Sequence, residues 1–228
     1  QGRYRYGIGW QMEGLVSSQD SDQAGELLSL RMMDSWRLLS MLENRLIDYW
    51  IGGLVDYSTL LAQPLARQRF GRVKVTASVM AVPLCRFDYQ LVCHQSHPLR
   101  VEKDINPDQL ALYPSPALAV GMAPVLMGQL QEHSLATAPS GMVNHDWLRW
   151  QAIGSDGIAL SYSPPHDLER LKAHGIEPLP YSLGITEVGA VLGHRDAIED
   201  GCFHGHLKAM VSMLRQGKPS CPGLHWLC

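Results

Sequence analysis

The order of strand and helix patterns in the first 53 residues constrains the fold of this chain more than any other feature. Residues 3–8 (RYRYGI) alternate charged and apolar side chains, and residues 26–32 (ELLSLRM) form a second alternating run, as expected for two strands. A helix of about three turns is expected to begin at residue 34, where apolar residues recur at three-to-four spacing. It leads into a buried strand over residues 49–51, which a pair of glycines is expected to end. This order predicts an α/β sheet with parallel pairing.

The rest of the chain continues this alternation. Residues 75–93 predict one or two strands, and residues 158–162 (IALSY) predict a further buried strand. An amphipathic helix is expected over residues 167–175, where the final glycine is its stop signal. Residues 186–195 then predict a strand, and residues 196–217 predict one long terminal helix that ends at a glycine.

Charge, hydropathy and cysteine content exclude several classes of protein. The 19 Lys and Arg residues against 22 Asp and Glu residues give a net charge of −3, so this chain alone is a poor candidate for DNA binding. Apolar runs are interrupted well before the roughly 18 residues that a membrane span needs. Five widely spaced cysteines without a Cys-x-x-Cys pair argue against a secreted disulfide framework and favour the cytoplasm.

Five sequence strings, taken in order, are similar to the effector-binding domain of a LysR-type transcriptional regulator. They are RYRYGIG, RLLSMLENRLIDYWIGG, LVCHQSHPL, IGSDGIALSY and the terminal strand with its helix. The first strand also starts with almost no leader, so we expect the chain to be part of a longer protein. The resemblance implies that the missing N-terminal part is a winged helix-turn-helix domain, and that DNA is contacted only through it.

The resemblance further implies an α/β fold of two Rossmann-like subdomains joined by two crossover strands, of the type-2 periplasmic-binding-protein kind. The first subdomain is expected at residues 1–74 with 181–228, and the second at residues 75–180. A small-molecule effector would bind in the cleft between them, without a cofactor, and the full-length protein would be a cytoplasmic homodimer or homotetramer that is not an enzyme. Residues 54–74 are longer than the connection usual in this family, which indicates an insertion.

Ligand contacts are expected beyond the carboxyl ends of the strands and at a helix N-terminus. By resemblance, Trp10, Gln11, Asp34 and Ser35 would supply the contacts of the first subdomain, although Ser35 also suits a plain helix cap and Trp10 also suits a core. For the second subdomain the resemblance implies a set of contacts on two loops and the returning strand: Ala119, Val120, Gly121, Met122, His145 and Thr186. The family's effectors are commonly small organic acids, and the nearby tryptophans favour an aromatic or indole-type carboxylate.

Two other features suggest chemistry. His97 precedes Pro98 and Leu99, and we expect it to be a turn residue rather than a catalytic one, because proline disfavours helical geometry before it.

A metal-dependent enzyme is an alternative function, and a solute-binding protein of a transporter is another. The metal site would use a C-terminal set whose spacing matches no standard zinc signature: Cys202, His204, His206, Cys221, His225 and Cys228.

Overall fold

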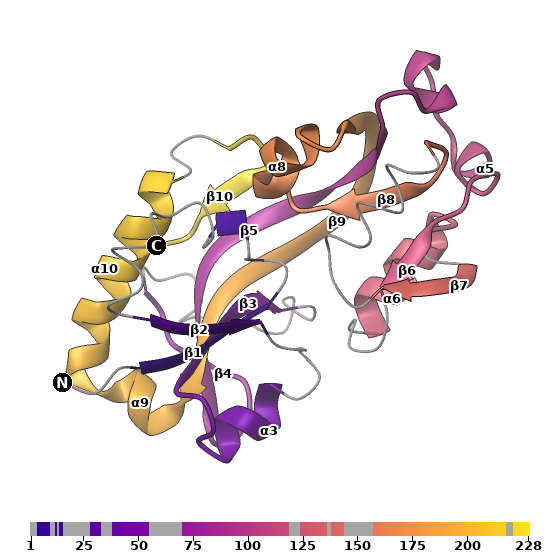
Figure 1. Ribbon diagram of the computed structural model, residues 1–228. Helices are drawn as coiled ribbons and strands as arrows, with labels where there is room; N and C mark the ends of the chain where they lie inside the picture. The colour runs from indigo at the N-terminus through magenta and orange to yellow at the C-terminus, as the bar shows by residue number, and fades with distance from the viewer. Residues whose placement is uncertain are drawn as a thin grey trace. The chain divides into compact units, whose positions relative to one another are not determined.

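The computed structural model divides the chain into two compact units (Figure 1). It describes residues 4–9, 12, 14, 15, 28–32, 38–54, 70–118, 124–135, 138–143, 157–217 and 221–228. The first unit comprises Gln1–Phe87 with Glu187–Cys228, and the second comprises Asp88–Thr186. Whether the subdomains end at residues 74 and 180, as expected from the sequence, stays a prediction.

The first unit is built on the parallel pairs that the sequence predicts. Strand β1 (Tyr4–Ile8) lies between β2 (Leu28–Met32) and β3 (Tyr49–Leu54), and both neighbours are parallel to it. The short helix α3 (Leu38–Glu43) precedes β3. On its other edge β3 pairs antiparallel with β9 (Ile176–His194), the returning strand.

Two long strands pass through both units. β5 (Val79–His94) has 16 residues and β9 has 19, and they are neighbours in the strand order β10-β5-β9-β3-β1-β2 (Figure 1). The sequence predicts one or two strands over residues 75–93, and the structure shows one strand from residue 79 onward. Pro83 falls between the β5 residues paired with β4 (Val73–Lys74) and those paired with β10 (Leu224–Trp226), so neither short partner needs its missing N–H.

The prediction that Gly52 and Gly53 end the third strand is wrong. β3 continues through both glycines to Leu54, and Gly52 pairs with Ala190 of β9. The reason is packing: a Cβ on Gly52 would lie 2.1 Å from Cη2 of Trp50, whose side chain is 1% exposed. Glycine here makes room for a buried indole within a strand, instead of turning the chain.

The second unit combines the distal half of β5 with short elements. β8 (Leu160–Ser163) pairs antiparallel with β5, and β6 (Pro116–Leu118) forms a separate parallel pair with β7 (Ala138–Val143). The helical elements in its described residues are the 3-10 turns η3 (Pro98–Val101) and η4 (Pro165–Asp167) and the helices α5 (Pro107–Leu110), α6 (Pro124–Glu132) and α8 (Leu168–Lys172). Gly175 ends the region of α8 at a φ of 70°, as a stop glycine should.

The C-terminal part of the first unit holds two helices where the sequence predicted one. α9 (Arg195–Glu199) and α10 (Gly201–Gly217) are separated by Asp200, whose backbone is extended. From α10, Phe203 stacks on Tyr49 with ring centroids 5.0 Å apart, which fixes the helix to β3. Among the helices of the described residues, none is both long and apolar enough to cross a membrane.

Candidate functional site

Of the ten residues that the sequence proposes as ligand contacts, Thr186 is the one within the described part of the chain. The other nine lie outside it: Trp10, Gln11, Asp34, Ser35, Ala119, Val120, Gly121, Met122 and His145. Their role in ligand binding therefore stays a prediction. The site can be built from Thr186 and the side chains around it.

Thr186 is the last residue of the second unit on β9, and it contacts the first residue of that unit on β5. Its hydroxyl Oγ1 donates a hydrogen bond to Oδ1 of Asp88 over 2.6 Å. Both side chains are half-buried. The two long strands are thus joined by side chains as well as by their backbone ladder, at the point where each leaves or enters the second unit.

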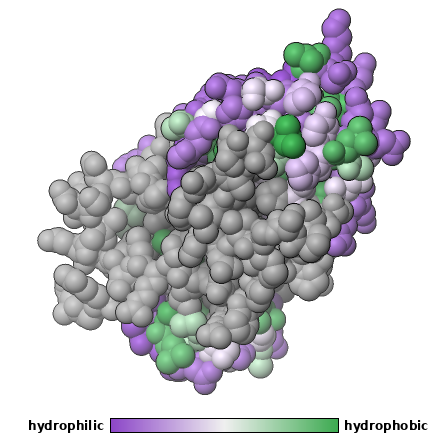
Figure 2. Space-filling view, turned by 45° about the vertical axis from the view of Figure 1, so that its right-hand side comes forward, coloured by the Kyte–Doolittle hydropathy of each residue, from purple (hydrophilic) through white to green (hydrophobic). Residues whose placement is uncertain are grey.

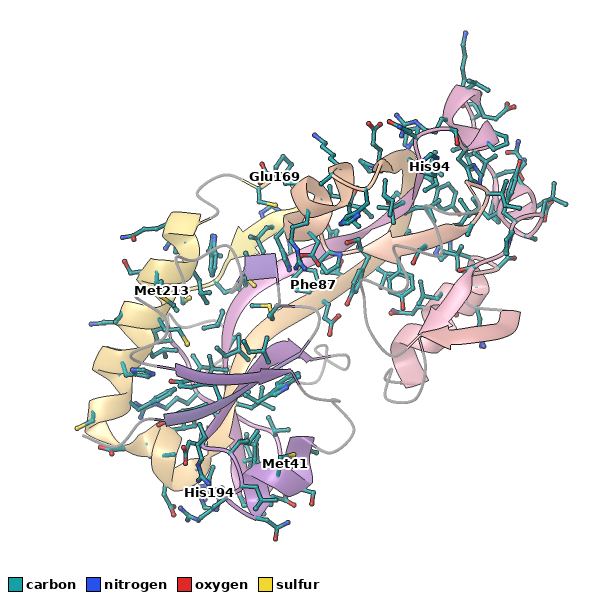
Figure 3. The ribbon with its side chains drawn as sticks, in the orientation of Figure 1. Met41, Phe87, His94, Glu169, His194 and Met213 are labelled. Atoms are coloured by element: carbon teal, nitrogen blue, oxygen red, sulfur yellow. The ribbon has the colours of Figure 1, made fainter. Side chains whose placement is uncertain are left out.

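The β5 sequence explains why Asp88 is accessible. Along Phe87-Asp88-Tyr89-Gln90-Leu91 the odd-numbered side chains are buried and the even-numbered ones are partly exposed, because successive side chains of a strand point to opposite faces. Figure 3 labels Phe87, the buried residue that directly precedes Asp88. Nε2 of Gln90 donates to the backbone carbonyl of Asp88 over 3.3 Å. We call Asp88, Gln90 and Thr186 the polar stripe.

Gly184 lies on β9, two residues before Thr186 of the polar stripe. It is exposed and has a φ of 63°, a left-handed conformation that favours glycine inside a strand and is typical of a β-bulge. A Cβ at this position would meet no atom within 4 Å. Backbone conformation rather than crowding therefore requires glycine here. Bulges often re-aim neighbouring side chains, and Thr186 lies two residues further on.

Asp88 is not among the ligand contacts expected from the sequence, although the sequence carries a signal for it. The run Arg86-Phe87-Asp88-Tyr89-Gln90 places a polar residue at every second position of an otherwise apolar strand. A strand that is covered on both faces reads as a continuous apolar run, whereas this alternation indicates one uncovered face. Asp88 can therefore be identified from the sequence as a residue on the uncovered face, but only when β5 is known to be one long strand.

His97 has the structural role expected from the sequence. It caps η3: its Nδ1 accepts a hydrogen bond from the backbone N–H of Leu99 over 3.1 Å, and its Nε2 donates to the carbonyl of Ile158 over 3.0 Å. The side chain is 2% exposed, and burial lowers the pKa of the imidazole. These contacts hold the neutral ring in one tautomer, so the predicted turn at Pro98 is confirmed.

The C-terminal cysteines and histidines have separate surroundings. His206 contacts the hydroxyl of Tyr6, Cys228 Sγ donates to the carbonyl of Leu84 over 3.3 Å, and Cys202 is exposed on α10. Within the described ranges, no group of three or more His, Cys, Asp or Glu side chains could hold a metal ion.

The buried thiols are poorly suited to nucleophilic chemistry. Cys85, Cys93 and Cys228 are buried, and burial raises the pKa of Cys93 to about 11 despite the nearby Arg100 guanidinium. Burial also raises the pKa of Cys85. Because the thiolate is the reactive form, the side chains of Cys85 and Cys93 act as small apolar core residues near neutral pH.

Three large hydrophobic side chains are exposed on the described part of the second unit. They are Val101, Leu112 and Ile158, at 83%, 78% and 47% exposure. Figure 2 shows hydrophobic side chains lying singly among hydrophilic ones in the coloured upper part of the molecule. Isolated exposed apolar residues of this kind are common on protein surfaces and do not indicate a binding site by themselves.

Comparisons with known proteins concern the fold. No model of a protein family matches the sequence, and no curated protein matches it. Among solved structures, a reduced form of OxyR from Neisseria meningitidis matches with a TM-score of 0.65 and 15% identity, over 100% of both chains. An OxyR mutant from Porphyromonas gingivalis matches with a TM-score of 0.67 and 13% identity, over 96% of this chain and 94% of the other.

A third match includes residues beyond the regulatory domain. A full-length OxyR variant from Pseudomonas aeruginosa has a TM-score of 0.66 and 15% identity, over 94% of this chain and 73% of that one. At such identities the likeness concerns the fold. The regulatory domains of OxyR are effector-binding domains of LysR-type regulators, so the predicted α/β fold of the type-2 periplasmic-binding-protein kind is confirmed.

Proposed function

We propose that this chain is the ligand-sensing domain of a bacterial LysR-type transcription regulator. The observation that carries the proposal is the match of the fold to an OxyR structure over the full length of both chains. The predicted ligand is a small organic acid, with an aromatic or indole-type carboxylate as the narrower expectation, bound in the cleft predicted between the subdomains. The domain itself does no chemistry.

DNA binding belongs to a domain outside these 228 residues. Two observations support this assignment: the net charge of −3 gives the chain little to neutralise phosphates, and the full-length OxyR variant extends beyond the part that this chain matches. The intact regulator would be cytoplasmic and would form a homodimer or homotetramer. Ligand binding would change DNA binding only if the ligand binds two arrangements of the domain with different affinity.

A thermal-shift screen tests the sensing role. The purified chain is heated with aromatic carboxylates, aliphatic carboxylates, amino acids and sugars, and a ligand that binds the folded state raises the melting temperature by mass action. We expect a hit among the acids that weakens on Ser35→Ala or Trp10→Ala but not on Ser182→Ala, an exposed β9 position. Silence across all four classes would contradict the proposal.

A reporter assay separates a regulator from a solute-binding protein of the same fold. The chain is fused behind a winged helix-turn-helix domain with a known operator, and transcription is measured with and without the hit. A regulator's sensing domain is expected to make transcription depend on the ligand. A ligand that binds the chain but leaves transcription unchanged would favour the solute-binding alternative.

A further inference from the structure

The carboxylates of the described residues differ in what lies beside them. Several of those carboxylates are held by a guanidinium, and the nitrogen–oxygen distances are 3.0 Å for Arg5–Asp48, 2.7 Å for Arg45–Asp196 and 2.5 Å for Arg100–Glu177. Asp88 forms no ion pair with any described residue. Its side-chain partner among them is the hydroxyl of Thr186. The charge of Asp88 is therefore oriented by a neutral donor and is not neutralised by a neighbouring cation of the described chain.

The Asp88 carboxylate also keeps acceptor capacity. An ionised carboxylate has two oxygens and can accept about four hydrogen bonds. From the described residues it accepts one, on Oδ1. Oδ2 accepts none from them. Since the side chain is only half-buried, a donor from outside the chain can reach it.

Asp88 lies next to a residue that is predicted to contact the ligand, so its free acceptor positions are relevant to ligand binding. Thr186, whose role as a ligand contact is a prediction from the family resemblance, donates a hydrogen bond to the carboxylate, and Gln90 lies on the same face of β5. A plain carboxylic acid beside Asp88 would bring two negative charges together without a cation between them. An acid that also carries an ammonium or hydroxyl group could instead donate a charge-assisted hydrogen bond to Asp88.

We propose that Asp88 determines ligand specificity by accepting a hydrogen bond from an ammonium or hydroxyl group next to the acid group of the ligand. The ligand class is then a 2-amino or 2-hydroxy acid, and not a plain carboxylic acid. Thr186 is a positioning residue that holds Oδ1 and leaves Oδ2 for the ligand. This inference rests on the proposed function, because it concerns the ligand of that same domain.

Calorimetric titration with matched pairs of acids tests the inference on the 228-residue protein. The pairs are L-tryptophan with indole-3-propionate, 3-phenyllactate with 3-phenylpropionate, and L-malate with succinate; each differs by one donor group. We expect the donor-bearing member of at least one pair to bind about tenfold or more tightly, the size of one hydrogen bond to a charged group. Asp88→Asn is expected to bring that ratio close to one, whereas Asp104→Asn, on an exposed turn, leaves it unchanged.

Thr186 variants distinguish positioning from mere structural support. Thr186→Val is expected to lower the ratio within a pair, and Thr186→Ser, which keeps the hydroxyl, is expected to restore it, with melting temperatures close to that of the parent. A loss of folding alone would weaken both members of a pair equally. The ratio is therefore a readout that general destabilisation does not change.

The possible failures are distinguishable. Equal binding of both members by the parent protein, or an equal loss of both in Asp88→Asn, would overturn the role of Asp88 and leave the sensing function standing. A ratio that Thr186→Val leaves intact would overturn the positioning role of Thr186. Binding of none of the six acids would count against the proposed function itself, and the inference would fall with it.

Discussion

The two halves of β9 have different environments although they belong to one strand. From residue 176 to residue 186 buried and accessible positions largely alternate, whereas every residue from 187 to 193 is buried. Alternation means that one face of the strand is covered, and continuous burial means that both faces are covered. The half in the second unit therefore presents Thr186 and Gly184 to the outside, while the half in the first unit is packed core. Among the described residues of β9, Thr186 offers a ligand a partly exposed polar side chain on the half that belongs to the second unit.

The same contrast is seen in the glycines of β9. A Cβ on Gly189 would lie 2.6 Å from Sδ of Met12 and 2.8 Å from Sγ of Cys85, whereas a Cβ on Gly184 would meet nothing within 4 Å. One glycine is required by neighbouring side chains, and the other by its φ of 63°. The core half is sensitive to added volume, and the accessible half is sensitive to backbone conformation.

The largest expected effect comes from removing volume in the buried half. Leu192 is 1% exposed and packs in a cluster with Trp50 and Val79, so Leu192→Ala is expected to lower the free energy of unfolding by about 3 kcal/mol. Urea denaturation measures this change. Ser182→Ala, on the accessible half, is the matched control and should change stability little. Equal losses of stability in Leu192→Ala and Ser182→Ala would contradict the difference in burial between the two halves of β9.

Substitutions of Gly189 and Gly184 are expected to change the free energy of unfolding by smaller amounts, and for different reasons. Gly189→Ala is expected to cost about 2 kcal/mol by overpacking, and Gly184→Ala about 1 to 2 kcal/mol through its left-handed backbone. Asparagine separates the causes, because it tolerates positive φ but adds more volume than alanine. Gly184→Asn should therefore be milder than Gly184→Ala, while Gly189→Asn should be harsher than Gly189→Ala. The opposite order at either position in denaturation experiments would contradict the assigned cause.

A pH dependence of stability tests the packing of His97. Burial holds the pKa of its imidazole below that of the unfolded chain, so the unfolded state binds more protons as the medium becomes acidic. Stability is therefore expected to be full above about pH 6.5, the usual histidine pKa, and to fall as the pH decreases below it. Thermal unfolding between pH 5 and pH 8 measures the slope for the parent protein and for His97→Asn.

His206 contributes to the same slope from the first unit, since burial also lowers its pKa. His97→Asn alone is expected to flatten the curve partly, and the double variant with His206→Gln to flatten it further. His225→Gln is the control, because His225 is exposed on β10. A curve that neither His97→Asn nor the double variant flattens would contradict the buried, neutral state of both rings.

Much of the fold could be predicted from periodicity, and the failures have physical reasons. The alternation in RYRYGI corresponds to β1, and the buried strand predicted at IALSY corresponds to β8, which begins two residues later than predicted because Ile158 is exposed. Gly52 was misjudged because a glycine that ends a strand and a glycine that makes room for an indole are identical in sequence. β10 was missed because its three residues are a strand only through pairing with β5, a contact distant in sequence.

The candidate site was less predictable than the fold. The resemblance suggested loop residues and one strand residue, Thr186, but not its partner Asp88, although the alternation along β5 was visible. A pairing between residues 98 positions apart depends on how two long strands lie together. Periodicity identifies which face of a strand is accessible; it does not identify the residue of another strand that meets it.

The most direct test that the ligand binds at the polar stripe is a map of backbone amide chemical-shift changes by NMR, on titration with the acid that binds best. We expect the shifts to concentrate on the accessible halves of the two strands, at Asp88–Gln90 and Gly184–Thr186, with little change at residues 188–193. Such a pattern would place the ligand at the polar stripe and support the sensing role of the domain. Shifts confined to residues 188–193, or none on either strand in the presence of a bound acid, would contradict it.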